Sequence, residues 1–310
     1  VEQRIWILRN NIMKTKKFIM GMVGIALLYA CEPLEDGHWT LNSTIELEWQ
    51  EEGKTFPEGV KDVSLNYYPQ DELNNPHTFT MTTNRMAVDV PTDKYNILAL
   101  QENNFMGKTN RFDYMTIELP THINEQAERI ISENPQKMIW AGKLKGVELD
   151  FEQRTWHTIT MEKVLKKLNF VVRIADTDEL KEKCTVDIAG MVTKLKLHNN
   201  EFDEESEAVQ IFDLIKHGRF LNTDRYLTEY RGSVYCLGAV GRNILHFTYT
   251  DARQEKRLAK YDVSQYFMDW NTTEITVAIY INADNDEVFL EGWEQGDVSD
   301  IIFNSITIIQ

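Results

Sequence analysis

Cys31 is the residue whose type and position in the chain most clearly predict a chemical role. It follows thirteen uncharged residues, Phe18 to Ala30, and a small alanine stands directly before it. Three lysines precede this apolar run. A membrane-spanning helix needs about 20 apolar residues, whereas the apolar core of a cleaved leader has about 7–15. We therefore predict a leader that is removed, with Cys31 directly after it.

The four residues that end the leader narrow this chemistry. Leu28-Tyr29-Ala30-Cys31 resembles the lipobox of bacterial lipoproteins, whose cysteine receives a diacylglycerol before the leader is cut. The resemblance implies that residues 1–30 are a signal peptide region, translated from Met13, and that lipid on Cys31 holds the protein to a membrane. Two acyl chains anchor a protein stably where one does not. An ordinary signal peptide that happens to precede a cysteine is the alternative.

The charge of the remaining chain restricts its partners. The whole chain has a formal charge of −16, and removing the leader, with five basic residues and one acid, leaves −20. Such a charge argues against nucleic acid and against adsorption to anionic lipid headgroups. Residues 31–40 form an acidic tether that resembles the surface-export signals of Bacteroidales lipoproteins. A plain solvated linker is the alternative.

Catalytic patterns are missing from the sequence. It contains no G-x-S-x-G, H-E-x-x-H or G-x-x-x-x-G-K-[ST] motif. The acidic segments 199–205 and 282–287 lack the spacing of a calcium loop, and we interpret them as solvated turns. We predict no enzyme activity, no metal and no cofactor; a hydrolase assembled from scattered acids stays open. The histidines show no ligand-pair spacing: His38, His77, His122, His157, His198, His217 and His246.

Tryptophans offer a second kind of site, because aromatic faces can stack on sugar rings. Trp49 and Trp140 lie within apolar alternation and are expected in the core. Trp39, Trp270 and Trp293 lie beside turn residues, so they are candidate exposed aromatics. Packing under a loop is the alternative for each of these three.

The elements that must position these residues are mostly strands. Apolar residues recur with a period of two, as in Ile45, Leu47 and Trp49, and short turns separate the runs. We predict an all-β fold of two tandem antiparallel β-sandwiches, covering residues 41–165 and 166–310. One short helix is expected in the first, at 121–134, where isoleucines follow helical spacing. Residues 209–216 fit either a strand or a short helix.

Two cysteines remain after the tether, and the sequence does not decide their state. Cys184 and Cys236 could form a disulfide in an oxidising compartment or stay buried as free thiols. Their separation of about fifty residues carries no geometric information.

Local features then resemble one family. Leu195 and Leu197 follow Ala189-Gly190-Met191, an apolar strand ends in glycine at 236–241, and 260–265 reads Lys-Tyr-Asp-Val-Ser-Gln. With the lipobox and two sandwiches, this order resembles the fimbrillin-like lipoproteins of Bacteroidales, especially anchor or accessory subunits of type V fimbriae. The resemblance implies transthyretin-like, Greek-key sandwiches, an outer-membrane location on the cell surface, and a fimbrial shaft subunit as partner.

The resemblance also implies a distinction between two subunit types. Shaft subunits lose their first strand to an arginine-specific protease, which opens a groove for a neighbour's strand, whereas anchor subunits keep it. This chain has no arginine between Cys31 and Arg85, so the anchor type is favoured.

The apolar C-terminal run 301–309 is the predicted partner strand, because a free strand of this kind would aggregate unless paired. Its candidate contact residues are Ile301, Phe303, Ile306 and Ile308. An ordinary edge strand is the alternative for the run. For the whole chain, the alternative function is a surface glycan-binding lipoprotein of a polysaccharide-uptake system.

Overall fold

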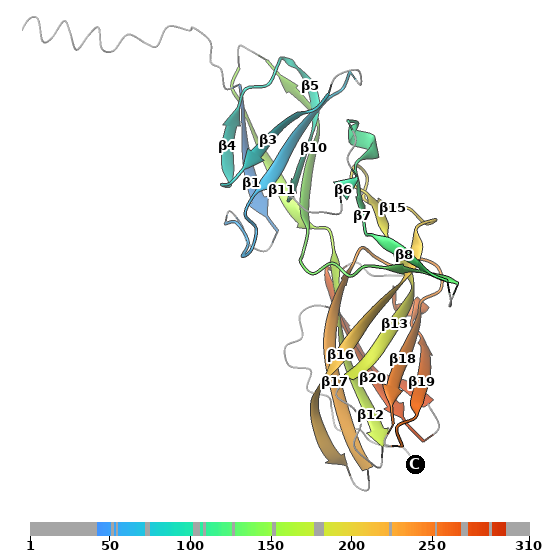
Figure 1. Ribbon diagram of the computed structural model, residues 1–310. Helices are drawn as coiled ribbons and strands as arrows, with labels where there is room; N and C mark the ends of the chain where they lie inside the picture. The colour runs from blue at the N-terminus through green and yellow to red at the C-terminus, as the bar shows by residue number, and fades with distance from the viewer. Residues whose placement is uncertain are drawn as a thin grey trace, which may run out of the picture.

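The computed structural model is built almost entirely of strands (Figure 1). It describes residues 42–50, 53, 55–71, 75–101, 106–107, 110–125, 128–150, 153–176, 183–222, 225–251, 253–267, 272–284 and 287–295. The leader, Cys31, Trp39, Trp270 and the run 301–309 lie outside these residues. No helix among the described residues is long and apolar enough to cross a bilayer.

A seven-stranded sheet arrangement contains the first strands of the chain, in the order β3-β2-β5-β10-β11-β1-β4. β1 pairs in parallel with β11, and the other neighbours are antiparallel. The two end strands, β3 and β4, come close to each other and so nearly close the layer into a barrel. The strands are β1 Ser43–Trp49, β2 Val63–Pro69, β3 His77–Met81, β4 Arg85–Val88, β5 Asp93–Gln101, β10 Trp140–Leu149 and β11 Thr155–Lys163.

A second, ten-stranded sheet follows the order β19-β18-β13-β16-β17-β12-β20-β21, with β9 pairing with β16 and β8 pairing with β9. Its end strands β19 and β21 also come close together. β12 pairs in parallel with β20, and β9 in parallel with β16. The strands are β8 Thr121–Asn124, β9 Arg129–Ser132, β12 Lys166–Asp176, β13 Lys183–Val192, β16 Glu207–Asn222, β17 Arg225–Cys236, β18 Ile244–Thr250, β19 Lys256–Asp262, β20 Glu274–Asn282 and β21 Glu287–Gln295.

A small third sheet joins segments from both parts of the chain, in the order β15-β14-β7-β6. Its central pairing joins β7 to β14, which lies far along the sequence. Figure 1 shows β6, β7 and β15 at the waist between the two larger sheets. The remaining elements are β6 Met106–Gly107, η1 Phe112–Tyr114, β7 Thr116–Glu118, β14 Lys194–Lys196, β15 Glu201–Phe202 and the short helix α2 Ser264–Phe267.

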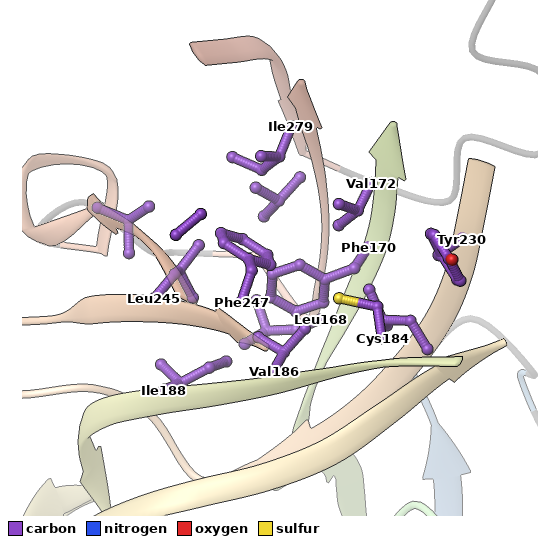
Figure 2. Close-up of a cluster of buried hydrophobic side chains, with 14 of the residues drawn as sticks. Leu168, Phe170, Val172, Cys184, Val186, Ile188, Tyr230, Leu245, Phe247 and Ile279 are labelled. Carbon is purple, nitrogen blue, oxygen red and sulfur yellow. The ribbon is translucent and has the colours of Figure 1, made fainter. Parts of the chain in front are cut away.

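Two large apolar cores fill the two strand layers, because alternate side chains of each strand face inward. One core draws on residues from Ile45 to Met161. The other draws on residues from Leu168 to Ala283 (Figure 2), where Phe170 of β12 and Phe247 of β18 point into the same cluster. We retain the division at residue 165 as a proposal, since these two cores use residues on either side of it.

A third core lies at the waist and links the two layers. It combines Leu98 and Leu100 of β5 with Leu195, Leu197 and Leu237 from the later half of the chain. Each buried leucine contributes roughly 1.5–3 kcal/mol. Buried apolar contacts therefore join the two sandwiches, in addition to the chain that connects them.

The all-β prediction is confirmed, and 209–216 is a strand within β16. The helix predicted at 121–134 is wrong, because β8 and β9 form a hairpin there. Its isoleucine spacing does not mark a buried face: Ile123 and Ile130 pair across the hairpin and are 71% and 45% exposed. Only Ile131 turns inward, where β9 pairs with β16. The predicted sandwiches are antiparallel, and the structure adds three parallel pairings.

Candidate functional site

The candidate site is the groove that holds β1, the first described strand after the tether. β1 lies between two strands, parallel to β11 along its whole length and antiparallel to β4 along its first four residues. Beyond β4, the Leu47 amide donates to the Asn84 carbonyl at 2.7 Å. Both edges of β1 are thus occupied by main-chain hydrogen bonds.

The inner face of β1 supplies three side chains to the core. Ile45, Leu47 and Trp49 are fully buried. Trp49 packs edge-to-face on Trp140, with ring centres 5.5 Å apart, and its indole N–H donates to Asn84 Oδ1 at 3.0 Å. Each of these side chains contributes roughly 1.5–3 kcal/mol by burial, so withdrawing β1 would expose a deep apolar groove.

The start of β1 is tied to neighbouring elements. The Asn42 side chain donates to the Val90 carbonyl at 2.6 Å and accepts from the Val90 amide at 3.1 Å. The Asn42 carbonyl accepts from the amide and the hydroxyl of Thr155. A force applied to the chain at Asn42 would therefore load several hydrogen bonds at once.

Tyr67 of β2 contacts the beginning of β1. Its hydroxyl lies 3.1 Å from Ser43 Oγ. Burial raises the pKa of Tyr67 to about 12, against a smaller opposing effect of the Ser43 hydrogen bond. The phenol therefore stays neutral at physiological pH and keeps its hydrogen bond to β1.

The outer face of β1 is crossed by a contact between its two neighbours. Arg85 of β4 pairs with Glu46, and Trp156 of β11 pairs with Thr44. The Arg85 guanidinium lies 3.7 Å from the centre of the Trp156 ring. Thr44 points outward yet is only 2% exposed. We call the Arg85–Trp156 pair the clasp.

The sequence-predicted site residues are distributed unevenly. Trp49 and Trp140 are in the core, as expected. Trp293 belongs to β21, where its backbone pairs with Val277. Trp156, which was not among the three candidates, is 51% exposed. No local signal marks it, because its partner Arg85 lies far away in sequence.

A sheet edge stands next to the predicted partner strand. β21 is an end strand of the ten-stranded sheet and pairs on one side with β20. The C-terminal run 301–309 follows β21 in the chain but lies outside the described residues. The structure therefore leaves its role as a prediction.

The cysteine question is settled for the two that follow the tether. Cys184 and Cys236 are free and buried in the second sandwich. Burial raises the pKa of Cys184 to about 12, with Asp213 adding to it, and burial also raises the pKa of Cys236. Within the described ranges, no group of three or more His, Cys, Asp or Glu residues is placed to hold a metal ion.

Comparison with known proteins places this geometry among solved folds. No family model matches the chain. No curated protein matches it. A candidate adhesin from Bacteroides thetaiotaomicron aligns over 83% of this chain and 96% of its own length, at 13% identity and a TM-score of 0.55.

Two further solved structures are similar. A candidate polysaccharide-binding protein from Bacteroides thetaiotaomicron covers 82% of this chain and 98% of its own, at 11% identity and a TM-score of 0.53. The fimbrial anchor protein Mfa2 from Porphyromonas gingivalis covers 81% and 95%, at 10% identity and a TM-score of 0.49. The two Bacteroides thetaiotaomicron structures establish a shared two-sandwich fold. Fold alone does not carry function.

Proposed function

We propose that this chain is a non-enzymatic anchor or accessory subunit of a fimbria, held at the cell surface in the outer membrane by lipid on Cys31. In this role the lipid fixes one end of the protein, and the folded body joins the first shaft subunit by strand addition. Main-chain hydrogen bonds supply affinity in such a joint, and side-chain pockets supply register.

One observation carries the proposal: β1 fills its own groove and cannot be released by an arginine-specific cut. It has partners on both edges and three fully buried side chains. No arginine stands between Cys31 and Arg85. A subunit that kept its first strand would stay joined to its lipid and would end the fimbria at the membrane. Solved neighbours described as adhesins have the same fold.

The predicted joint is the C-terminal run 301–309. It follows β21, an end strand of the second sandwich. An apolar strand leaving a sheet edge can pair with a partner's groove in place of its own sheet.

Removing residues 301–310 tests this joint. We expect the truncated protein to remain folded and lipid-bound but to lose co-purified fimbrial subunits. Two double variants test whether the side chains on one face of the run enter pockets of the partner, or whether any added charge disrupts the joint. Ile306→Asp with Ile308→Asp places charges on one face of the strand, whereas Ser305→Asp with Thr307→Asp places them on the opposite face. If only the Ile306→Asp, Ile308→Asp variant loses the co-purified fimbrial subunits, the joint is supported. If the truncated protein still co-purifies with them, the joint is rejected.

The lipid anchor has its own test. Cys31→Ser removes the acceptor thiol, so the protein is expected to move from the membrane fraction to the soluble fraction. Mass spectrometry of the natural protein would show diacylglycerol on Cys31. An unmodified Cys31 in membrane-bound protein would reject the anchor without bearing on the strand joint.

A surface glycan-binding lipoprotein is the second candidate function. A structural neighbour described as a polysaccharide-binding protein favours it. The candidate contact residues are Trp39, Trp270 and Trp293. Glycan-array binding that is lost in Trp270→Ala or Trp293→Ala and kept in Trp156→Ala would support this role over the fimbrial one.

A further inference from the structure

A cleft of about 480 Å³ opens at the waist of the molecule. One wall comes from β10 and β11 of the first sandwich, and the other from β14, β15 and the turn between them. A volume of this size lies within the range of about 300–1,000 Å³ that small-molecule sites occupy. The cleft is separate from the β1 groove and from the C-terminal run.

The cleft exists because two sheet edges diverge. β10 and β11 pair only at Trp140–Lys163 and Ala141–Glu162. Past this point β10 continues its pairing with β5, and β11 continues its pairing with β1. The facing edges of β10 and β11 separate there, and the exposed Thr158 and Thr160 of β11 line the opening.

Its lining is cationic in an acidic protein. Three lysines, Lys143, Lys163 and Lys166, line the cleft together with one acid, Glu162. Lys143 Nζ donates to the Leu197 carbonyl at 2.7 Å and to Asn200 Oδ1 at 2.8 Å, both neutral oxygens. Among the described residues it forms no ion pair. Burial, more than the nearby Lys145, lowers the pKa of Lys143, against a smaller opposing effect of Glu162.

The opposite wall is apolar. Leu195 and Leu197 are buried behind the cleft, and the half-buried Phe202 lies beside them. A Cβ at Gly238 would lie 2.4 Å from Phe202 Cζ, so the ring packs directly on the backbone. A fixed apolar wall facing amines and hydroxyls suits a flat ligand with one apolar face and a charged edge.

The narrow floor of the cleft excludes an added β-strand. A Cβ built on Gly142 would lie 2.4 Å from the Thr160 carbonyl oxygen. Inserting a strand would require β10 and β11 to stand about 9.5 Å apart, twice the spacing of paired strands. A small ligand fits without such movement.

We propose that the waist cleft binds an acidic saccharide, with the sugar carboxylate at Lys143 and the ring face on Leu195, Leu197 and Phe202. Thr158 and Thr160 offer hydroxyls to the sugar. This inference goes beyond the fimbrial role, and it gives a binding site that does not use Trp39, Trp270 or Trp293.

Calorimetric titration of the full chain tests the site. The probes are digalacturonic acid, the neutral disaccharide of galactose, inorganic phosphate and an acidic hexapeptide, all at physiological ionic strength. We expect digalacturonic acid to bind and the other three to bind at least tenfold more weakly. Lys143→Gln should weaken binding of digalacturonic acid about tenfold. The control Lys183→Gln, whose lysine lies on β13 and pairs with Asp213 of β16, should leave binding unchanged.

A second variant tests whether weaker binding could come from loss of the folded structure. Asn200→Asp places a carboxylate where the amide oxygen now lies 2.8 Å from Lys143 Nζ, so it neutralises the cation and preserves the contact. We expect it to weaken digalacturonic acid as much as Lys143→Gln, with unchanged thermal unfolding. No binding by the natural protein, or binding by Lys143→Gln and Asn200→Asp that is as tight as that of the natural protein, overturns the proposal. Equal binding of phosphate, the neutral sugar or the peptide overturns the assignment of an acidic saccharide.

Discussion

The Arg85 guanidinium lies 3.7 Å from the centre of the Trp156 ring and crosses the outer face of β1. The two residues belong to the strands on either side of β1, so their contact closes the groove from outside. Beneath it, Thr44 is buried, and its hydroxyl has no hydrogen-bond partner among the described residues. Leaving that hydroxyl unsatisfied costs free energy, and the clasp above Thr44 keeps water from it.

Removing the clasp should loosen β1 selectively. A cation–π contact at an exposed site contributes about 0.5–1 kcal/mol, so Arg85→Gln should speed hydrogen exchange of the β1 amides roughly twofold to fivefold. Arg111→Gln is the matched control, because Arg111 stacks on Tyr114, away from β1, at 4.7 Å. Equal acceleration by both variants would show that the clasp does not act on β1.

Glu229 should be a strong source of stability in the second sandwich. It is 2% exposed, and it accepts hydrogen bonds from Arg173 Nε at 2.9 Å and Arg231 Nε at 2.8 Å. Glu229→Gln removes the charged carboxylate that both arginines contact and should lower the free energy of unfolding by about 3 kcal/mol. The control Glu148→Gln, at an exposed pair with Lys94, should change it by about 0–1 kcal/mol. Chemical denaturation at neutral pH measures both.

Acid should remove the contribution of Glu229. Burial alone would raise the pKa of Glu229, but hydrogen bonds from Arg173 and Arg231 outweigh it and hold the pKa below 4.5. The carboxylate therefore stabilises the fold fully above pH 4.5, and the effect is lost as pH falls through the lowered folded-state pKa. The stability gap between natural protein and Glu229→Gln should narrow below pH 4.5. A gap that stays constant into that acidic range would contradict the ion-pair account.

The two core thiols should be inert in the folded protein. Cys184 and Cys236 are buried and free, and burial raises both pKa values, that of Cys184 to about 12. Thiolate is the reactive form, so in Cys31→Ser protein neither should react with a thiol reagent at pH 8 before denaturant is added. Both should react afterwards. An intact mass lower by two hydrogens than the reduced protein would instead reveal a disulfide.

Gly190 should tolerate no side chain. Its φ is +73°, and an added Cβ would lie 2.5 Å from Asn243 Nδ2 and 2.6 Å from the Val240 carbonyl oxygen. Gly59→Ala is the matched control, because Gly59 also has positive φ but an open surround. The control should lose about 1 kcal/mol from backbone strain, whereas Gly190→Ala should lose about 3 kcal/mol because crowding is added. Equal losses in denaturant unfolding would exclude crowding.

Much of the fold could be predicted because strand periodicity is local. Ile275, Val277, Ile279 and Ile281 alternate in the sequence and all face the core in β20. Side chains of any extended segment point to alternate faces, so burial of one face requires an apolar residue at every second position. The helix prediction for 121–134 was wrong for a local reason too. Four-residue strands are too short to show a period, and Glu128, at φ +50°, bends the chain between them.

The sequence by itself determined the strand content, the apolar run that ends before Cys31, the acidic charge and the lack of arginine between Cys31 and Arg85. Only the tertiary structure decided that β1 lies between β4 and β11, that Arg85 meets Trp156, and that three lysines gather at the waist. The physical reason is the sequence distance over which each effect acts. The backbone sets side-chain direction within a few residues, whereas the choice of neighbours follows from packing of the whole chain and the closure of long loops.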